Sequence, residues 1–446
     1  MRIIIAGAGD LGFHLAKLLS HEQQDIVLID NDDDALLYAA THLDIQAIQG
    51  DSASILVLEQ AEVSKASLFL AMTTSEKNNL MSCILAKKMG ASHTVARVTN
   101  QEYLTESQRM SFDELGIDSV ICPTQLAAHE VVRLVAQSTV TDLFEFENGQ
   151  LTLAGFLVDA HSPIVNLSFE EIEKRHEGQY FKPIALQRGD KTIIPRGGTV
   201  VRRKDHIYFL TPKNKIEEAI KIVGKTPVKV RNVMIAGGTE VGLKSAQLLE
   251  DKYSVVIIEK SKERCKVLAQ QLRRALVVHG DPSSLELLKE EGLERMDAFV
   301  ALTANSETNI ITSLLAKKSG VRKTVSLVDN TDYTHISQNI GVDTLINKKL
   351  IAANNVFRYV RKGKVEAIAS LHGVDAEVIE FSILKENRLT RKPIKDLHFP
   401  KEAVVAGVIR GSKSIFPTGN TVLEKGDKVI VFAQHSAIPL VEKLFR

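Results

Sequence analysis

The sequence contains no tryptophan, and only 5% of its residues are aromatic. A protein that stacks unpaired bases needs several aromatic side chains on one surface, so this composition disfavours single-stranded nucleic acid as a ligand. Three cysteines are present, Cys83, Cys122 and Cys265, and their spacing fits neither a disulfide framework nor a zinc site. The 13 histidines are scattered through the chain. We therefore expect no metal centre.

Long apolar runs and a strong net charge are missing as well. No stretch approaches the roughly 20 apolar residues of a membrane-spanning helix. The first apolar run is too short for a signal peptide, and Asp10 soon interrupts it. A net charge of +1 gives no overall attraction to nucleic acid or anionic lipid. We interpret the basic runs Arg202–Lys204 and Lys348–Lys349 as solvated faces. These features indicate a cytoplasmic protein.

A glycine-rich turn lies near the start of the chain. The apolar residues 3–6 predict a buried strand, and leucines at helical spacing predict a helix directly after the turn. In a turn of this kind Gly7 makes the bend, Gly9 lets the backbone approach a pyrophosphate, and Gly12 lets the helix pack against the strand. The helix N-terminus offers free N–H groups to the phosphates. The turn consists of Gly7, Ala8, Gly9, Asp10, Leu11 and Gly12.

An acid follows at the distance that a dinucleotide-binding domain requires. Residues 26–29 predict a second buried strand, which ends in Asp30, about 20 residues after the turn. A carboxylate there accepts hydrogen bonds from ribose hydroxyls and repels a 2′-phosphate, which favours NAD or adenosine over NADP. The alternative is a surface acid that ends a strand. The order of strand, turn, helix, strand and acid favours the dinucleotide site.

The chain repeats this unit about 230 residues later. A second turn contains Gly237, Gly238, Thr239, Glu240 and Val241, and a second apolar strand ends in Glu259. Three further islands recur at nearly the same offset, as Gly50-Asp51 with Gly280-Asp281, Thr73-Thr74 with Thr303-Ala304, and Ala86-Lys87-Lys88 with Ala316-Lys317-Lys318. A duplicated unit explains all five matches.

Each unit begins with alternating strands and helices and continues with shorter strands. In the first copy, strands near 2–6, 26–30, 45–49, 68–72, 94–98 and 119–121 predict a parallel, doubly wound Rossmann-like sheet. Period-two alternation near 143–159, further strands near 180–187, 191–195 and 206–210, and a helix at 213–223 predict a small α+β domain. We predict a Rossmann-like domain at 1–138, a small domain at 139–224, a linker at 225–231, a second Rossmann-like domain at 232–363 and a second small domain at 364–446.

The whole chain resembles the TrkA family, the peripheral nucleotide-binding subunits of bacterial Trk potassium-uptake systems, which carry two tandem RCK modules. The duplication carries the resemblance, together with Gly50-Asp51, Thr73-Thr74 and the segment from Ala96-Arg97 to Tyr103. The small-domain segment Pro163–Val165 and the turn at Pro195 also match the family pattern.

The resemblance implies nucleotide contacts in both copies. In the first copy they fall on residues 7–11, Asp30, Asp51, Thr73, Thr74 and Arg97, and in the second on residues 237–241 and Glu259. Threonine hydroxyls at a strand end could bond ribose or phosphate, and the guanidinium of Arg97 could neutralise phosphate. Strand-end capping by the threonines, a surface ion pair of Arg97 and simple turn formation by Asp51 are the alternatives.

The second copy departs from the pattern at two positions. Thr239 stands where the first copy has Gly9, and Leu327 stands where it has Arg97. The second site could bind nucleotide more weakly, bind another adenine nucleotide, or serve only as a scaffold.

The resemblance implies a non-enzymatic regulator that gates a Trk-type potassium transporter. It implies NAD or NADH as the ligand, with ATP and ADP as alternatives that the sequence does not rank. It also implies a homo-oligomer, a tetramer, docked on a Trk membrane subunit at the inner face of the cell membrane. An NAD-dependent oxidoreductase is the alternative, since the same turn serves dehydrogenases, but no histidine, lysine or tyrosine stands out as a catalytic base.

Overall fold

The computed structural model describes residues 1–20, 24–104, 112–137, 139–176, 181–189, 191–226, 229–330, 333, 341–360, 365–371 and 376–445. Tyr180, where a strand is predicted to begin, Pro227 of the linker and the boundary residues 138, 363 and 364 lie outside them. The chain divides into two compact units, Met1–Ala127 with Lys348–Val360, and Ala128–Asn347 with Arg361–Arg446. The predicted domain boundaries follow the repeat, whereas compactness joins a helix of the second copy to the first.

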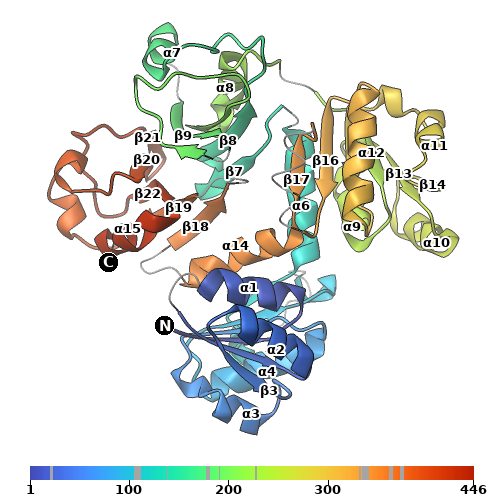
Figure 1. The fold of residues 1–446 in the computed structure, drawn as a ribbon, viewed down its shortest axis with the longest axis vertical. Coiled ribbons are helices and arrows are strands. Elements are labelled where there is room, and N and C mark those ends of the chain that lie inside the picture. Colours follow the sequence, from blue (N-terminus) through green and yellow to red (C-terminus); the bar gives the residue numbers. More distant parts are fainter. Residues whose placement is uncertain are drawn as a thin grey trace. The chain divides into compact units, whose positions relative to one another are not determined.

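The first unit is built on a six-stranded parallel sheet in the order β3-β2-β1-β4-β5-β6 (Figure 1). This is the doubly wound sheet that the alternating pattern predicts. Its strands are β1 (Arg2–Ala6), β2 (Asp25–Asp30), β3 (Gln46–Gln49), β4 (Leu68–Ala71), β5 (Thr94–Arg97) and β6 (Ser119–Ile121). Its helices are α1 (Asp10–Ser20), α2 (Asp33–His42), α3 (Ile55–Gln60), α4 (Glu76–Lys88) and α5 (Phe112–Leu115).

The central strands are apolar on both faces because helices cover both sides of a parallel sheet. Ile3, Ile4 and Ile5 of β1 are fully buried. Helix α4 begins at a cap in which the Ser75 side chain accepts a hydrogen bond from the backbone of Asn78. Such caps fix where each helix starts and therefore which residues face the carboxyl edge of the sheet.

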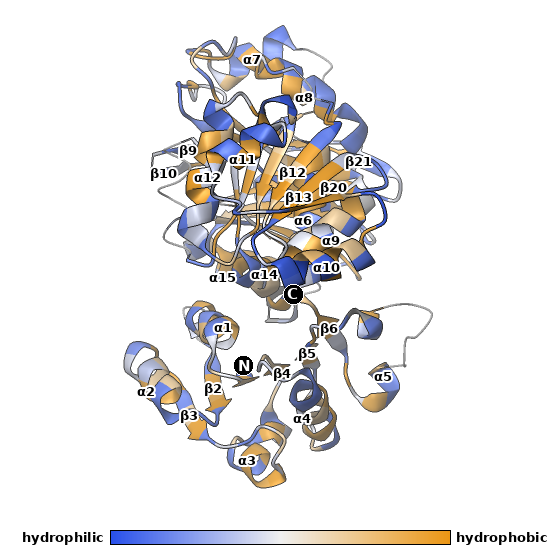
Figure 2. Cartoon of the chain, turned by 90° about the vertical axis from the view of Figure 1, so that its right-hand side faces the viewer, coloured by the Kyte–Doolittle hydropathy of each residue, from blue (hydrophilic) through white to orange (hydrophobic). Residues whose placement is uncertain are grey.

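The second unit contains the same parallel sheet again, in the order β14-β13-β12-β15-β16-β17. Its strands are β12 (Asn232–Ala236), β13 (Ser254–Glu259), β14 (Leu276–His279), β15 (Ala298–Ala301), β16 (Lys323–Leu327) and β17 (Thr344–Ile346). Its helices are α9 (Glu240–Leu249), α10 (Lys262–Gln271), α11 (Leu285–Glu290) and α12 (Ser306–Lys318). The middle residues of β12 and β13 are apolar and buried, and these strands carry hydrophobic colour in Figure 2, as expected of strands buried on both faces.

Two antiparallel five-stranded sheets complete this unit and confirm the small α+β domains. The first has the order β10-β9-β11-β8-β7, with β7 (Leu143–Phe146), β8 (Leu151–Leu157), β9 (Lys182–Arg188), β10 (Lys191–Ile193), β11 (His206–Thr211), α7 (Phe169–Arg175) and α8 (Ile216–Ile222). The second has the order β18-β19-β22-β20-β21, with β18 (Val365–Ser370), β19 (Ala376–Ser382), β20 (Ala403–Arg410), β21 (Lys413–Ile415), β22 (Lys428–Gln434) and α15 (Ile438–Leu444).

The two small sheets share one apolar core. Phe146 and Leu210 of the first sheet lie in the same buried cluster as Val378 and Phe432 of the second. The amine of Lys182 donates to two backbone carbonyls of the second small domain, at 3.2 and 3.0 Å. Burial lowers the pKa of Lys182 to about 8. The two small domains therefore pack as one body through both apolar and polar contacts.

Two helices are exchanged between the copies. Helix α14 (Lys348–Val360) follows the second parallel sheet in sequence but packs against α1 of the first unit, as Figure 1 shows. Conversely, the part of α6 (Pro123–Ala136) from Ala128 onward belongs to the second unit. There burial and then the charge of Lys244 on α9 lower the pKa of His129 on α6. Each helix thus lies near the first helix of the other copy.

The exchange overturns the solvated-face interpretation of Lys348–Lys349. The side chain of Lys349 is only 23% exposed, and its amine lies 3.4 Å from a carboxylate oxygen of Asp10. A basic pair near a helix start is usually solvated, but here a helix from the other copy covers it. By contrast, residues 202–204 are exposed, as predicted.

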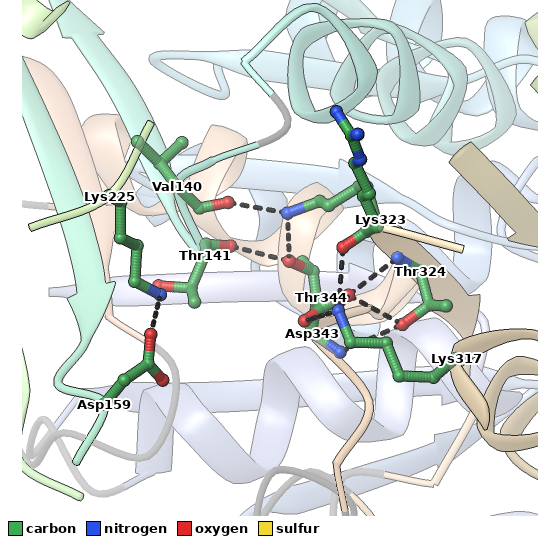
Figure 3. Close-up of polar contacts among 10 residues, drawn as sticks. Val140, Thr141, Asp159, Lys225, Lys317, Lys323, Thr324, Asp343 and Thr344 are labelled. Carbon is green, nitrogen blue, oxygen red and sulfur yellow. Dashed lines mark hydrogen bonds and ion pairs between the residues drawn. The ribbon is translucent and has the colours of Figure 1, made fainter. Parts of the chain in front are cut away.

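A polar network repeats at the edge of each parallel sheet. In the second copy the Asp343 carboxylate accepts from the Lys317 amine at 2.7 Å and from the Thr324 backbone at 2.8 Å (Figure 3). In the first copy Asp118 accepts in the same way from Lys87 at 2.9 Å and from the Thr94 backbone at 2.7 Å. Each aspartate therefore joins the last strand to the helix and strand before it.

One residue of this edge differs sharply between the copies. Lys323, which is 1% exposed, donates from its amine to the Val140 carbonyl at 2.6 Å and to the Thr344 hydroxyl at 2.9 Å (Figure 3). The corresponding residue of the first copy is His93, whose ring stacks on Tyr359 of α14 with centroids 4.5 Å apart. Lys323 and His93 therefore each contact a residue that belongs to the other copy in sequence.

Among the described residues, none of the helices has the length and apolar character needed to cross a bilayer.

Replacement of the buried Lys323 should change how the stability of the protein depends on pH. Burial lowers the pKa of Lys323 from 10.5 to about 8. Between these two values the unfolded chain binds more protons than the folded chain, so stability rises as pH increases. From pH 7 to 10 the wild type should gain up to about 3 kcal/mol relative to Lys323→Met, measured as a growing difference in melting temperature. The variant Lys221→Met, at an exposed lysine, is the control, and a constant difference between wild type and Lys323→Met would contradict this assignment.

Candidate functional site

The candidate site lies at the carboxyl edge of the first parallel sheet, where the strand order reverses. Strands β1 and β4 are neighbours, and the strands that follow them in sequence extend the sheet in opposite directions. Open α/β sheets bind ligands in the crevice at this position. Gly7 directly follows β1, and Thr73 lies just after β4. The sequence-predicted turn and threonines therefore meet at one point.

The three glycines of the turn have different surroundings. Gly7 has a φ of +108°, and a Cβ there would lie 2.8 Å from the Thr73 backbone nitrogen. A Cβ on Gly12 would lie 1.7 Å from the Gly7 carbonyl oxygen, which accounts for the close contact of helix and turn. A Cβ on Gly9 would meet nothing within 4 Å. Packing thus requires glycine at positions 7 and 12, whereas position 9 opens onto free space at the N-terminus of α1.

Asp30 holds the turn from the end of β2. One oxygen of its carboxylate accepts from the Ala8 backbone at 2.5 Å, and the other accepts from the Asp32 backbone at 3.0 Å. In the second copy the oxygens of Glu259 accept from the backbones of Gly238 and Ser261, each at 2.7 Å. A carboxylate has about four acceptor positions, so both acids retain capacity for a ribose hydroxyl.

Arg97 ends β5 with its guanidinium only partly bonded. One terminal nitrogen donates to the Met72 carbonyl at 3.4 Å, and the buried Nε has no hydrogen-bond partner among the described residues. Burial lowers the pKa of Arg97, while the nearby Cys122 and Asp10 oppose that shift. A half-buried cation with an unused donor at a sheet edge fits an anionic ligand.

The threonine hydroxyl of Thr73 serves the protein itself. It donates to the Asn79 side-chain oxygen at 2.6 Å and accepts from the Ser75 backbone at 3.2 Å. This is the strand-end capping that the sequence left open as an alternative. Thr74 is exposed beside it. The backbone around Thr73, rather than its hydroxyl, therefore shapes the crevice.

Sequence reasoning missed Asn79. Its amide nitrogen donates to the carbonyls of Thr73 at 3.0 Å and Arg97 at 2.9 Å, so it ties the ends of β4 and β5 together. Asn309 makes the same two bonds in the second copy, to Thr303 at 3.0 Å and Leu327 at 2.9 Å. The identity of these asparagines across the repeat was the signal that could have found them.

Asp51 forms a turn beyond β3. Its Oδ1 accepts from the Ala53 backbone at 2.9 Å and from the Asn78 amide at 3.2 Å. Asn78 lies on α4, so this bond brings the β3 loop to the helix that borders the crevice. Turn formation, the alternative for this residue, is therefore present, and its role toward a ligand stays a prediction.

The second copy's turn has the same frame but is covered by its own side chains. The Thr239 hydroxyl donates to the Leu302 carbonyl at 2.8 Å and caps α9, so it is turned into the protein. Arg264 of α10 donates to the Gly238 carbonyl at 2.7 Å and to the Glu240 carboxylate at 2.8 Å. Leu268 is fully buried, and its side chain lies 2.5 Å from the position of a Cβ on Gly238.

The corresponding residues of the first copy leave its turn free of such a cover. Ala35 stands where the second copy has Arg264, and Ala39 stands where it has Leu268, as the matching helix caps at Asp32 and Ser261 show. The alanine at position 35 has no side-chain donor for the turn carbonyl, whereas the guanidinium of Arg264 supplies one. The two sites therefore differ in access as well as in charge.

Two ionisable side chains of α4 have shifted pKa values. Backbone donation from Asn100 and then Thr99 lowers the pKa of Glu76. Burial raises the pKa of Cys83, so this thiol is not a nucleophile at neutral pH. The described residues contain no group of histidine, cysteine and carboxylate side chains suited to a metal ion.

Comparison with known families matches nearly the whole chain. Residues 3–123 and 233–348 match the TrkA-N domain, and residues 153–224 and 378–446 match the TrkA-C domain. The chain is 31% identical over 455 residues to Trk system potassium uptake protein TrkA homolog 1 of Methanosarcina mazei, with all of both chains covered. It is 31% identical over 451 residues to Trk system potassium uptake protein TrkA of Halomonas elongata, covering 100% of this chain and 99% of that one.

Solved structures share the fold at lower identity. The GsuK channel bound to NAD superposes with a TM-score of 0.62 at 17% identity, covering 100% of this chain and 78% of that chain. The GsuK bound to ADP superposes with a TM-score of 0.51 at 14% identity, covering 80% and 68%.

Alanine substitutions at Gly12, the most tightly packed glycine of the turn, and at Gly9, the open one, should have different effects on stability. Gly12→Ala should destabilise the first unit by about 3 kcal/mol, because the new Cβ would collide with the Gly7 carbonyl. Gly9→Ala should cost less than about 1 kcal/mol, because its Cβ enters free space. Melting temperature is the measurement. Equal losses in both variants would mean that position 9 is packed as tightly as position 12.

Proposed function

Because the chain belongs to the TrkA family of Trk-system potassium-uptake proteins, we propose that it is a regulatory subunit that senses a nucleotide and gates a potassium transporter. The observation that carries the proposal is the first copy's turn, in which Gly9 leaves the N-terminus of α1 open. Backbone N–H groups at a helix N-terminus bind phosphate well. The half-buried, partly bonded guanidinium of Arg97 adds a positive charge at the same edge.

The ligand we propose is NAD or NADH, with ATP and ADP as competing adenine nucleotides. Residues 7–11 would receive the phosphates, Asp30 the ribose hydroxyls and Arg97 a phosphate oxygen. Asp51 and Thr74 would border the adenosine. The structures of GsuK with NAD and with ADP, which share this fold, support an adenine nucleotide. No residue is assigned a catalytic role.

We propose that the first copy is the stronger nucleotide site. In the second copy, Arg264 and Leu268 occupy the entrance to the turn of residues 237–241, and Leu327 replaces the arginine. A nucleotide there would have to displace the bonds of Arg264 with Gly238 and Glu240. Glu259 supplies the acid that corresponds to Asp30, so the second copy has the turn and the acid of a site, but a nucleotide would reach them less easily.

Gating follows if nucleotides prefer one conformation of the assembled regulator. A ligand shifts a two-state equilibrium only by its difference in affinity for the two states, and about 1.4 kcal/mol suffices for a tenfold bias. The relatives are named as potassium uptake proteins, so we propose a Trk membrane subunit as the partner. The regulator would act as a homo-oligomer, a tetramer, on the cytoplasmic face of the membrane.

Exchanging one residue between the copies tests the site. Gly9→Thr should fold normally, because Thr239 already caps a helix at the matching position, but its Cβ should narrow the open mouth. Binding of NADH and ADP should weaken about tenfold or more in calorimetry, as for loss of bonds to a charged group. The reverse change, Thr239→Gly, is the matched control and should leave the dominant affinity unchanged. Wild-type affinity in a folded Gly9→Thr variant would remove the first turn from the site.

Reconstitution with the membrane partner tests the gating. Potassium flux should change when ATP, ADP, NAD and NADH are exchanged, and the Gly9→Thr variant should lose that response while still assembling. Flux that stays constant in a complex shown to bind nucleotide would leave the protein as a scaffold whose ligand only stabilises the fold.

A further inference from the structure

A lysine of the second copy lies at the mouth of the first copy's site. Helix α14 packs on α1 within the first unit and brings Lys349 to within 3.4 Å of a carboxylate oxygen of Asp10 (Figure 1). Asp10 is the first residue of α1 and part of the glycine-rich turn. The Asp10 side chain is 86% exposed, whereas that of Lys349 is 23% exposed. The side chain of Lys349 is therefore mostly covered, whereas the Asp10 carboxylate that its amine contacts is exposed to solvent.

Two cations act on this one carboxylate. Asp10 is among the groups that oppose the burial-driven lowering of the Arg97 pKa, so its charge reaches the guanidinium. The charge of Lys349 also acts on α1. Burial and then Lys349 lower the pKa of His14, on that helix, to about 4. The mouth beside Gly9 is thus bordered by positive charge from β5 and from α14. The negatively charged carboxylate of Asp10 lies between these two cations, where a bound phosphate would also be attracted.

We propose that Lys349 is a phosphate ligand of the nucleotide bound by the first copy, and that its amine leaves Asp10 for a phosphate oxygen when the nucleotide arrives. The inference rests on the proposed function of this site. It adds a residue that the glycine-rich turn does not predict, because it comes from a helix more than 300 residues later in the chain.

The exchange of partners is energetically easy. An ion pair with an exposed carboxylate contributes at most about 1 kcal/mol, since water screens it. A phosphate offers more charge and more acceptor oxygens than the carboxylate that it replaces. The covered stem of Lys349 also has less freedom to lose on binding than an exposed lysine. Phosphate occupancy would therefore hold α14 against α1 more firmly, which links the first site to the second copy.

The repeat supports a role specific to this site. The residues of α6 that correspond to Lys348 and Lys349 are Pro123 and Thr124, neither of which is charged. The basic pair is thus present only on the exchanged helix that packs against the turn with the open mouth. Arg97, the other cation of that mouth, is likewise absent from the second copy, where Leu327 takes its place.

Two substitutions with opposite expected effects test the proposal in the full-length protein. Lys349→Met should weaken ADP binding about tenfold in calorimetry, through loss of a charged contact. Asp10→Asn should strengthen ADP binding, because the carboxylate that competes for the amine is gone. Adenosine, which carries no phosphate, should bind the wild type and Lys349→Met equally. If Lys349 and Asp10 only fasten α14 to α1, both variants lose the same ion pair and both should bind ADP more weakly, which would overturn the proposal.

Controls separate this inference from the proposed function. Lys17→Met removes a cation about two turns further along α1 and should leave ADP affinity unchanged. Melting temperature verifies that each variant is folded. If Gly9→Thr abolishes ADP binding but Lys349→Met does not change it, the site stands and the role of Lys349 is wrong. If the wild type binds neither ADP nor NADH, the nucleotide site itself is wrong.

Discussion

The carboxylate at the end of the second strand holds the whole site in place. Asp30 accepts from the turn at Ala8, and Glu259 accepts from Gly238 in the second copy. A charge-assisted bond of this kind is short and directional, so it fixes where the turn ends and where α1 begins. The N-terminus of α1 then follows directly after β1, which pairs with β4. The same acid therefore shapes the turn and is the residue that we propose as the ribose ligand.

Duplication preserved this frame while its surroundings diverged. Asn79 and Asn309 bond the same strand ends, and the acids of both copies bond the same positions of the turn. The groups that would touch a ligand differ, since Arg264 covers the second turn and Ala35 stands at the matching place in the first. Backbone geometry was kept because both sheets need it. Side chains at the mouth were free to change because the fold does not depend on them.

Exchange of helices α6 and α14 makes the two copies depend on each other. Tyr359 stacks on His93 in the first unit, and Lys323 bonds the segment after α6 in the second. Each copy thus completes its parallel sheet with contacts from the other copy's chain.

Much of this could be predicted from the order of residues. The apolar runs marked the central strands β1, β2 and β4 to within about two residues, because a strand buried on both faces is apolar along most of its length. The glycines at 7 and 12 and the acid at 30 identified the turn, since backbone geometry leaves few other residues possible there. Helix α7 was missed although Ser168 and Glu171 form a capping box, which is a local signal. Folding in three dimensions alone decided that Lys349 lies at Asp10, that Arg264 covers the second turn, and that the Thr73 hydroxyl bonds Asn79. Those contacts join residues whose separation along the chain carries no periodicity, so only the packing of helices on sheets could bring them together.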